Sequence, residues 1–257
     1  MKFRFIDTDY NDQFMNMAID EALLISKIPV LRFYRWKPST ISIGYFQSMK
    51  NEINIEKCKE LGIGYVRRLT GGKAVFHDKE LTYSFIIDES LMPKTILESY
   101  KQISEGIVNG LVELGINPEM RKEVDKKLQS SNCFHVPSYY ELTINNKKFV
   151  GSAQKRQNGK ILQHGSILID ADYDLMCSLF SQNSENFLEE TKKRVTSISN
   201  ELGKKITYQQ LGTFLKSGFS KAFKAEMYES QLTHEESQLA KKLVREKYAT
   251  DAWNLMK

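Results

Sequence analysis

The sequence predicts an α/β domain with a C-terminal helical subdomain, and three observations support this fold class. Short runs rich in β-branched and aromatic residues recur up to about residue 170, as in strands. Segments with apolar residues every three or four positions separate those runs, as in amphipathic helices. After about residue 185 the strand signal fades and two helix-opening motifs follow. We therefore expect an α/β body at residues 1–184 and a helical cap, integral to the same domain, at residues 185–257.

The first half of the chain is expected to alternate helices and strands. A first helix, capped by Asn11 or Asp12, is predicted from an apolar stripe that begins at Phe14. A short helix is predicted at 51–61, and a longer one ends at Gly115, which supplies the stop. Runs bounded by turn residues predict the strands of this half, at 30–36, 40–45, 63–68, 75–77 and 81–87.

A β-meander is expected between residues 139 and 169. Asn145-Asn146 would join its first two strands, because Asn tolerates the left-handed backbone that a tight hairpin requires. Gln157-Asn158-Gly159 would form the second turn. The three strands are predicted at 139–144, 148–154 and 160–169. Capping boxes at Thr207 and Thr233 would open the helices of the C-terminal cap.

Composition and charge are those of an ordinary soluble protein. Of the 257 residues, 41% are hydrophobic and 27% are charged. No apolar run approaches the roughly 20 residues that span a bilayer, and the N-terminus lacks the apolar stretch of a signal peptide. A cytoplasmic protein with no membrane partner is therefore expected. No nucleic-acid-binding motif accompanies the formal net charge of +5, so we expect no nucleic-acid partner.

The three cysteines form no C-x-x-C pair and the four histidines are dispersed, so neither a disulfide framework nor a metal site is expected. Cys58 and Cys177 lie among apolar residues of predicted helices and are interpreted as packed hydrophobes. Cys133 differs, because it lies in a polar loop closed by Pro137, 15 residues before Lys148. An ammonium beside a thiol lowers the pKa of the thiol and makes it nucleophilic. We therefore predict that Cys133 and Lys148 are the catalytic residues.

The segment RRLTGGKAVFHD, residues 67–78, is a second candidate site. The Gly71-Gly72 pair would let a ligand lie against the backbone, although a plain hairpin turn explains it as well. Arg67, Arg68 and Lys73 favour an anionic or polar ligand. His77, and His164 in the meander, either orient a substrate or are hydrogen-bonded structural histidines.

Basic residues are dense around these segments. Such a face would steer an acidic partner, although a lysine-rich surface often serves only solubility. The cluster comprises Arg67, Arg68, Lys73, Arg121, Lys122, Lys126, Lys127, Lys147, Lys148, Lys155, Arg156 and Lys160.

Four segments in order resemble the biotin/lipoate protein ligase and transferase superfamily: RRLTGGKAVFHDKELTYS, SSNCFHVPSYYEL, KKFVGSAQ and ILQHGSILID. Together with the tail THEESQLAKKLVREKYATDAWN, they most resemble its single-domain, cysteine-dependent octanoyltransferases. The resemblance implies the mixed β-sheet flanked by helices of class II synthetases and biotin ligases. The α/β body would then be catalytic.

The resemblance also implies a reaction in lipoate biosynthesis. Octanoyl would move from the 4′-phosphopantetheine thioester of acyl carrier protein to a lysine of a lipoyl domain or of the glycine cleavage H protein. Cys133 would carry the acyl group and Lys148 would be the essential basic residue. No cofactor is implied, and a monomer is expected. The substrate-binding residues would be Arg68, Gly71, Gly72, Lys73, His77, Gly151, Ser152, Ala153, His164 and Gly165.

This sequence departs from the pattern of its relatives at two positions. His135 stands where such relatives usually have an acidic residue, and Lys73 where they tend to have arginine. The first difference bears on the environment of the thiol, and the second keeps the charge. We expect an apolar slot for the eight-carbon chain, lined by Val75, Phe149 and Ile161.

Three other functions remain open at this point. An amidotransferase would move octanoyl between lipoyl proteins. An ATP-dependent lipoate ligase would need no cysteine, whereas a carrier thioester is already activated and needs no ATP. A module that only binds lipoyl domains would leave Cys133 without a chemical role.

Overall fold

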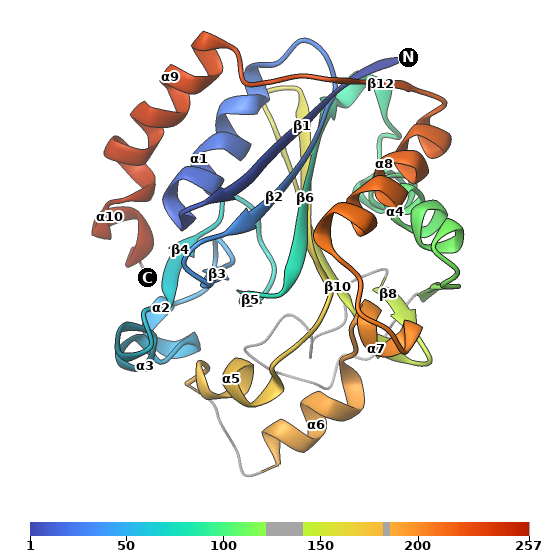
Figure 1. Cartoon of the computed structure of the whole chain (residues 1–257). Helices are drawn as coiled ribbons and strands as arrows, with labels where there is room; N and C mark the ends of the chain where they lie inside the picture. The colour runs from blue at the N-terminus through green and yellow to red at the C-terminus, as the bar shows by residue number, and fades with distance from the viewer. Residues whose placement is uncertain (122–140, 182–185, 257) are drawn as a thin grey trace.

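A mixed six-stranded sheet forms the centre of the computed structural model, which describes residues 1–121, 141–181 and 186–256 (Figure 1). β1 is parallel to both of its neighbours, β2 and β12, and the other pairs are antiparallel. The strand order is β10-β11-β6-β2-β1-β12. The strands are β1 (Lys2–Asn11), β2 (Val30–Trp36), β6 (Glu80–Asp88), β10 (Val150–Gln157), β11 (Lys160–Leu168) and β12 (Glu226–Glu229).

Two three-stranded sheets accompany the large one. The first has the order β4-β3-β5 and the second β7-β8-β9. The strands are β3 (Thr40–Ile43), β4 (Gly64–Arg67), β5 (Val75–His77), β7 (Glu119–Arg121), β8 (Glu141–Ile144) and β9 (Lys147–Lys148). The predicted turns are confirmed, since Asn145, Asn146 and Asn158 have φ of 50°, 65° and 52°.

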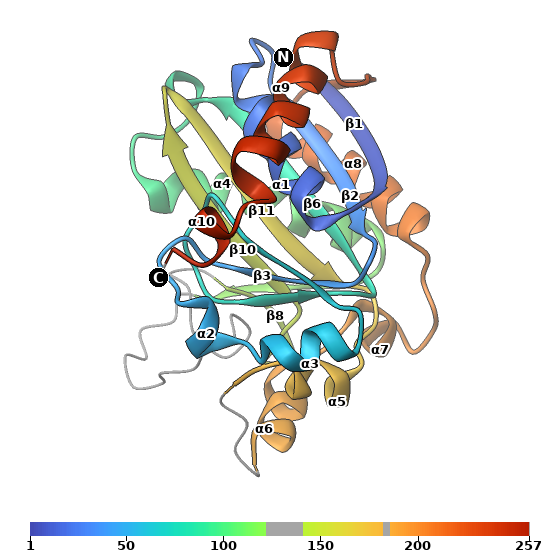
Figure 2. The same ribbon diagram turned by 90° about the vertical axis from the view of Figure 1, so that its left-hand side faces the viewer.

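Helices cover both faces of the large sheet, with α4 and α8 on one face and α1 and α9 on the other (Figures 1 and 2). None of the helices in the described residues is long and apolar enough to cross a membrane. The helices are α1 (Gln13–Ala22), α2 (Met49–Glu52), α3 (Ile55–Glu60), α4 (Ile96–Glu113), α5 (Tyr173–Ser178), α6 (Phe187–Arg194), α7 (Ile198–Leu202), α8 (Tyr208–Phe223), α9 (His234–Leu243) and α10 (Asp251–Asn254). Short 3₁₀ or π turns lie at Leu23–Ile25, Glu89–Leu91 and Val244–Tyr248.

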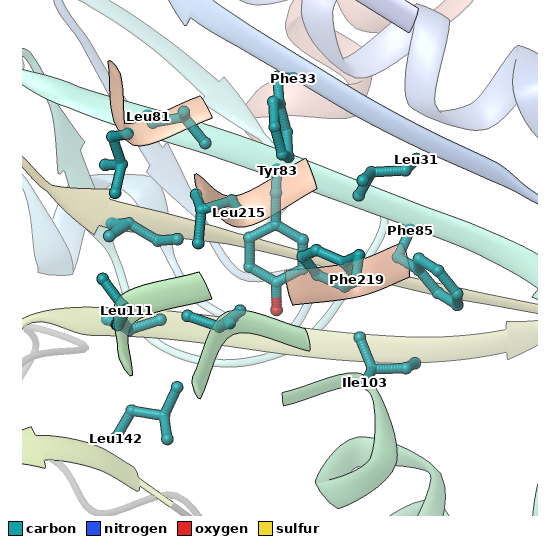
Figure 3. Close-up of a cluster of buried hydrophobic side chains, with 14 of the residues drawn as sticks. Leu31, Phe33, Leu81, Tyr83, Phe85, Ile103, Leu111, Leu142, Leu215 and Phe219 are labelled. Carbon is teal, nitrogen blue, oxygen red and sulfur yellow. The ribbon is translucent and has the colours of Figure 1, made fainter. Parts of the chain in front are cut away.

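The two faces of the sheet differ in polarity. On the side of α4 and α8, aromatic and aliphatic side chains of β2 and β6 pack into the main core (Figure 3). On the opposite side, β6 places Glu80, Thr82 and Ser84, which are all buried. Because side chains alternate along a strand, one strand supplies both environments. Buried polar groups need partners, so the polar face under α1 is where a site is expected.

The predicted α/β class is confirmed, but three predicted elements need correction. The helix expected at 51–61 is two short helices, α2 and α3, which are separated by Ile53, whose backbone pairs with that of Phe180. The strand expected at 148–154 divides at Phe149: β9 pairs with β8, whereas β10 joins the large sheet. Phe149, between the two strands, is fully buried in the main core, and the backbone changes from one sheet to the other at this residue.

The segment expected to be only helical contains β12. This four-residue edge strand is held by backbone pairing with β1 and carries glutamates at both ends, so its sequence lacks the apolar alternation of a strand.

Glycines allow α4 and α8 to cross closely. A Cβ placed on Gly218 would lie 2.2 Å from the backbone nitrogen of Gly110 and 2.3 Å from the carbonyl oxygen of Gly106. Both neighbouring atoms are backbone, so they cannot move aside as a flexible side chain could. Gly212, on the same helix, would place its Cβ no closer than 3.5 Å to Phe33.

Two alanine substitutions on α8 are therefore expected to have opposite effects. Gly218→Ala should lower the free energy of unfolding by about 1–3 kcal/mol, because it overpacks the helix crossing. Gly212→Ala should raise it by about 0.5–1 kcal/mol, because alanine restricts the unfolded chain and fits without a clash. Urea unfolding of both variants measures the difference, and equal effects would contradict this account of the crossing.

Candidate active site

A pocket opens on the polar face of the large sheet, beneath α1 and beside β5. Its empty space is about 330 Å³, part of it open to solvent. The residues that line it come from α1, β2, β3, β5, β6, β10, β11 and the segment after β4. They are Met17, Tyr34, Trp36, Ser42, Arg68, Val75, His77, Thr82, Gly151, Ser152, Ala153, His164, Gly165 and Ser166. Seven of the ten predicted substrate-binding residues thus surround one pocket.

The Gly71–Gly72 loop, residues 70–73, borders this pocket. Gly72 has φ of 89°, a left-handed conformation that favours glycine. Its α-carbon lies near β10, because a Cβ there would be 3.7 Å from the Cβ of Ala153. A Cβ on Gly44 would lie only 1.9 Å from the carbonyl oxygen of Gly72, so the loop packs against the backbone after β3.

The buried side chain of Arg68 is hydrogen-bonded to the backbone of this loop. Its guanidinium donates to the carbonyl oxygens of Gly71 at 2.8 Å and Lys73 at 2.9 Å. It also donates to the carbonyl and the hydroxyl of Ser42, at 2.9 and 3.0 Å. The side chain is 5% exposed. Arg68 therefore fixes the path of the loop along the wall of the pocket.

A buried chain of polar groups anchors the first residue of the loop. The hydroxyl of Thr70 lies 2.7 Å from Nε2 of His164, and Nδ1 of His164 lies 2.8 Å from Oδ2 of Asp20. Asp20 also accepts from Arg32 at 2.6 Å and from the hydroxyl of Tyr34 at 2.9 Å. These groups come from α1, β2, β11 and the loop, so this series of hydrogen bonds links four segments of the protein.

The ionisation of Asp20 sets the proton positions in this chain. Burial acts to raise the pKa of the Asp20 carboxyl, but Arg32 and His164 outweigh burial and the net pKa is lowered. A carboxylate only accepts, so Nδ1 of His164 carries the proton that it donates. The second ring nitrogen, Nε2, forms the hydrogen bond to the hydroxyl of Thr70. The loop is thereby linked to Asp20 through His164.

Asp20, Arg32 and Thr70 were missed by the sequence analysis. The available signal was a carboxylate within the apolar stripe of the first helix and an arginine between two core residues of a strand, Leu31 and Phe33. A charge at a core position implies a buried partner.

His77 forms part of the pocket wall. Its Nε2 lies 2.7 Å from the hydroxyl of Ser42, and the indole of Trp36 stacks on its ring with centroids 4.2 Å apart. Burial lowers the pKa of His77, although Glu80, whose carboxylate lies 3.4 Å from Nδ1, acts in the opposite direction. A neutral, stacked imidazole suits the wall of an apolar pocket.

Lys148 lies on β9, three residues before Gly151 of the pocket wall, and is 4% exposed. Its carbonyl accepts from the backbone of Thr196 at 2.9 Å. Lys148 is not among the residues that line the pocket. Cys133 lies outside the described residues, so the predicted meeting of Cys133 and Lys148 stays a prediction.

The remaining predicted residues lie around the same pocket. Ser152 pairs with Gly165, and Ala153 with His164, across β10 and β11. A Cβ on Gly165 would lie 2.5 Å from the hydroxyl of Ser152, so only glycine fits between these strands. Gly71, Gly72 and Lys73 lie on the bordering loop.

The other two cysteines are buried, as expected. Cys58 is fully buried and Cys177 is 3% exposed. Burial raises the pKa of Cys58 to about 11 and also raises that of Cys177. A thiol held in its neutral form is a poor nucleophile.

The predicted apolar slot is correct for one residue of three. Val75 lines the pocket. Phe149 and Ile161 were wrong, because both belong to the main core on the opposite side of the sheet. Met17, Tyr34 and Trp36 supply the apolar wall instead.

Comparison with known proteins places the chain among lipoate-attaching proteins. The model of the lipoyl protein ligase A/B catalytic domain matches residues 12–220. Octanoyltransferase LipM of Brevibacillus brevis is 44% identical over 272 aligned positions, covering 99% of each chain. Octanoyltransferase LipM of Bacillus subtilis is 43% identical, covering 98% of this chain and 97% of that protein.

Solved structures agree with the fold. A lipoate-protein ligase A bound with ATP superposes with a TM-score of 0.86 at 27% identity, covering 99% of both chains. The bi-partite lipoate protein ligase from Thermoplasma acidophilum has a TM-score of 0.84 at 27% identity, covering 99% of this chain and 96% of that chain. The expected mixed sheet flanked by helices is thus shared with lipoate ligases.

Replacement of Asp20 tests the buried chain of polar groups. Asp20→Asn leaves Arg32, which is fully buried, without its carboxylate, and should lower the free energy of unfolding by about 3–5 kcal/mol. Chemical denaturation measures this loss. As a control, Glu226→Gln breaks an ion pair to Lys2 whose side chains are 69% and 72% exposed, and should change stability little. Similar small losses in both variants would refute the role of the buried pair.

Proposed function

The chain belongs to the lipoyl protein ligase A/B catalytic family and is an octanoyltransferase, and from this premise we propose how it selects and moves the acyl group. Octanoyl would be taken from the thioester of an acyl carrier protein and passed to a lysine of a lipoyl-carrying protein. Cys133 would hold the acyl group between the two transfers.

The observation that carries the proposal is the pocket itself. It has an apolar wall, formed by Met17, Tyr34, Trp36 and Val75. Beside it lies the glycine loop, in which Gly72 is exposed and lies close to Ala153 of the pocket. A saturated eight-carbon chain gains free energy from burial against such a wall. The thioester carbonyl at its end would lie near the loop, where only hydrogen atoms of Gly71 and Gly72 separate it from the main chain.

The proposed reaction has two balanced steps. In the first, the Cys133 thiolate attacks the carbonyl of the carrier thioester; a new C–S bond forms, the bond to the carrier sulfur breaks, and that sulfur takes up a proton. In the second, the neutral amine of the acceptor lysine attacks the Cys133 thioester. A C–N bond forms, the C–S bond breaks, and the proton lost by the amine goes to the cysteine sulfur. Because the donor is already a thioester, ATP is not consumed.

Lys148 would supply fixed positive charge to both steps. An ammonium beside the sulfur favours the thiolate, and one beside the carbonyl oxygen stabilises the tetrahedral intermediate. Its burial on β9 supports this role, since packing restrains a buried side chain. Arg68 and His164 would act mainly by holding the glycine loop, which both of them contact through hydrogen bonds.

The basic face would guide the acidic carrier protein, but fewer residues contribute than the sequence suggested. Arg67 is fully buried, and Arg156 donates to Glu89 and to the carbonyls before α4. Lys148 is buried and Lys160 pairs with Asp88 at 3.4 Å. The other described lysines of this cluster are Lys73, Lys147 and Lys155, which are half-buried.

Intact-mass measurement tests the covalent route. Incubation with octanoyl-carrier protein and no ATP should add one octanoyl group to the wild-type protein and none to Cys133→Ala. Cys133→Ser should also abolish turnover, because Lys148 cannot generate an alkoxide. Near-normal turnover of the serine variant would disprove the thiolate.

The rival functions give other results in the same assay. A ligase would need ATP and would form no adduct on the enzyme. An amidotransferase would be charged only from an octanoylated lipoyl protein. A binding module would be charged by neither donor.

Replacement of Lys148 tests the role of the buried ammonium. Lys148→Ala should slow the formation of the octanoyl adduct by roughly 100-fold, the typical loss on removal of one preorganised electrostatic donor. Rapid-quench mass measurement gives the rate. Lys205→Ala, at an exposed position on another part of the chain, is the control and should keep the wild-type rate. An unchanged rate in Lys148→Ala would show that another group activates Cys133.

A further inference from the structure

Arg67 is fully buried, and its guanidinium has no carboxylate partner among the described residues. Within the described residues, its side-chain hydrogen bonds all go to backbone carbonyl oxygens. In the turn after β3 it donates to Gly44 at 3.2 Å, Tyr45 at 2.9 Å and Gln47 at 2.6 Å. On α10 it donates to Trp253 and Asn254, both at 3.0 Å. Burial lowers the pKa of Arg67, so these carbonyls are what stabilise its charge.

The C-terminal helix α10 binds the same residue in return. The side-chain oxygen of Asn254 accepts from the backbone nitrogen of Arg67 at 2.9 Å. The indole nitrogen of Trp253 donates to the carbonyl of Arg67 at 2.9 Å. The side-chain nitrogen of Asn254 donates to the carbonyls of Tyr248 and Thr250, which fixes its orientation. α10 therefore docks on β4 through a set of complementary hydrogen bonds (Figure 1).

The turn that Arg67 holds is in contact with the glycine loop. The backbone nitrogen of Tyr45 donates to the carbonyl of Thr70 at 2.8 Å. Gly44 packs so closely on Gly72 that a side chain would overlap its carbonyl oxygen. A displacement of this turn must therefore move the loop, because the contact leaves no free space between them.

We propose that α10, acting through Arg67, positions the Gly71–Gly72 loop for acyl transfer. Trp253, Asn254 and Arg67 are positioning residues, since each acts through the turn at Gly44 and none lines the pocket. The inference rests on the proposed function for its effect on catalysis, but the mechanical link from α10 to the loop stands independently. α10 also lies beyond residue 220, where the match to the catalytic-domain family ends.

Loss of this support should affect the reaction more than substrate binding. The acyl chain would be held by the wall of the pocket, to which α10 contributes no residue, whereas the loop would place the reacting carbonyl. A small displacement of a reacting group can reduce the rate by roughly 100-fold. The maximal rate should therefore fall while the KM for the donor changes little.

The test compares Asn254→Ala and Trp253→Phe with Thr207→Ala. The first variant removes the contacts of the Asn254 amide, and the second removes one N–H donor but keeps an aromatic ring. Thr207→Ala removes the N-cap of α8, far along the chain from α10, and serves as a control for general destabilisation. Thermal unfolding establishes how far each variant is destabilised.

Two measurements decide the outcome. Amide hydrogen exchange at Tyr45, whose N–H donates to the carbonyl of Thr70 in the loop, should increase relative to β11 by roughly tenfold or more in both α10 variants and not in the control. The kcat for octanoyl transfer should fall by roughly tenfold or more, with KM within about threefold of wild type. The control should keep both values within about twofold.

The proposal is overturned if exchange and kcat in the α10 variants match those of Thr207→Ala, or if only KM changes. If Asn254→Ala fails to fold, Trp253→Phe decides alone, because it removes a single hydrogen bond. A wild-type protein without octanoyl transfer would refute the proposed function, and the exchange measurements would still decide whether α10 holds the loop.

Discussion

The buried pair of Arg32 and Asp20 is the interaction on which the rest of the site depends. It joins β2 to α1 inside the protein, where neither charge reaches water. Two ions can remain there only because further groups complete their hydrogen bonds, among them Asn16, Tyr34 and His164. His164 in turn orients Thr70. The position of the glycine loop therefore depends on the ion pair of Arg32 and Asp20, to which the loop is linked through Thr70 and His164.

The large sheet packs one face into the main apolar core, and its other face carries the pocket. Its face toward α4 and α8 holds the main apolar core, and the two helices approach closely because glycines face each other at their crossing. Its face toward α1 holds Glu80, Thr82 and Ser84 beneath the pocket. A rigid apolar layer on one side lets the same strands present polar groups accurately on the other.

Much of the architecture could be predicted from local patterns. The paired asparagines at 145–146 indicated a hairpin, and both adopt left-handed backbone. The capping boxes at Thr207 and Thr233 begin helices where expected. Such signals are local, since a turn or a cap depends on residues a few positions apart.

Features that depend on distant partners could not be predicted in this way. β12 exists because β1 offers it an open edge, and its own residues carry no strand pattern. In the sequence, Asp20 and Arg32 are isolated charges in separate elements, and only the fold shows that they form an ion pair. Ile161 was assigned to the pocket although it faces the main core, because the face of a strand is fixed only by its pairing register. Arg68 was expected to contact a ligand, and its position in the fold directs it to the loop carbonyls.

The pairing of β1 with β12 has a consequence for biosynthesis. One edge of β1 pairs with β2, which follows it closely in the sequence, whereas the other edge pairs with residues 226–229. The buried contact of Arg4 with Glu236 closes over an even longer separation. During translation, this edge of β1 is therefore unpaired until residues 226–229 have left the ribosome. Contacts of such high sequence separation slow folding, and an uncovered edge invites association with other nascent chains.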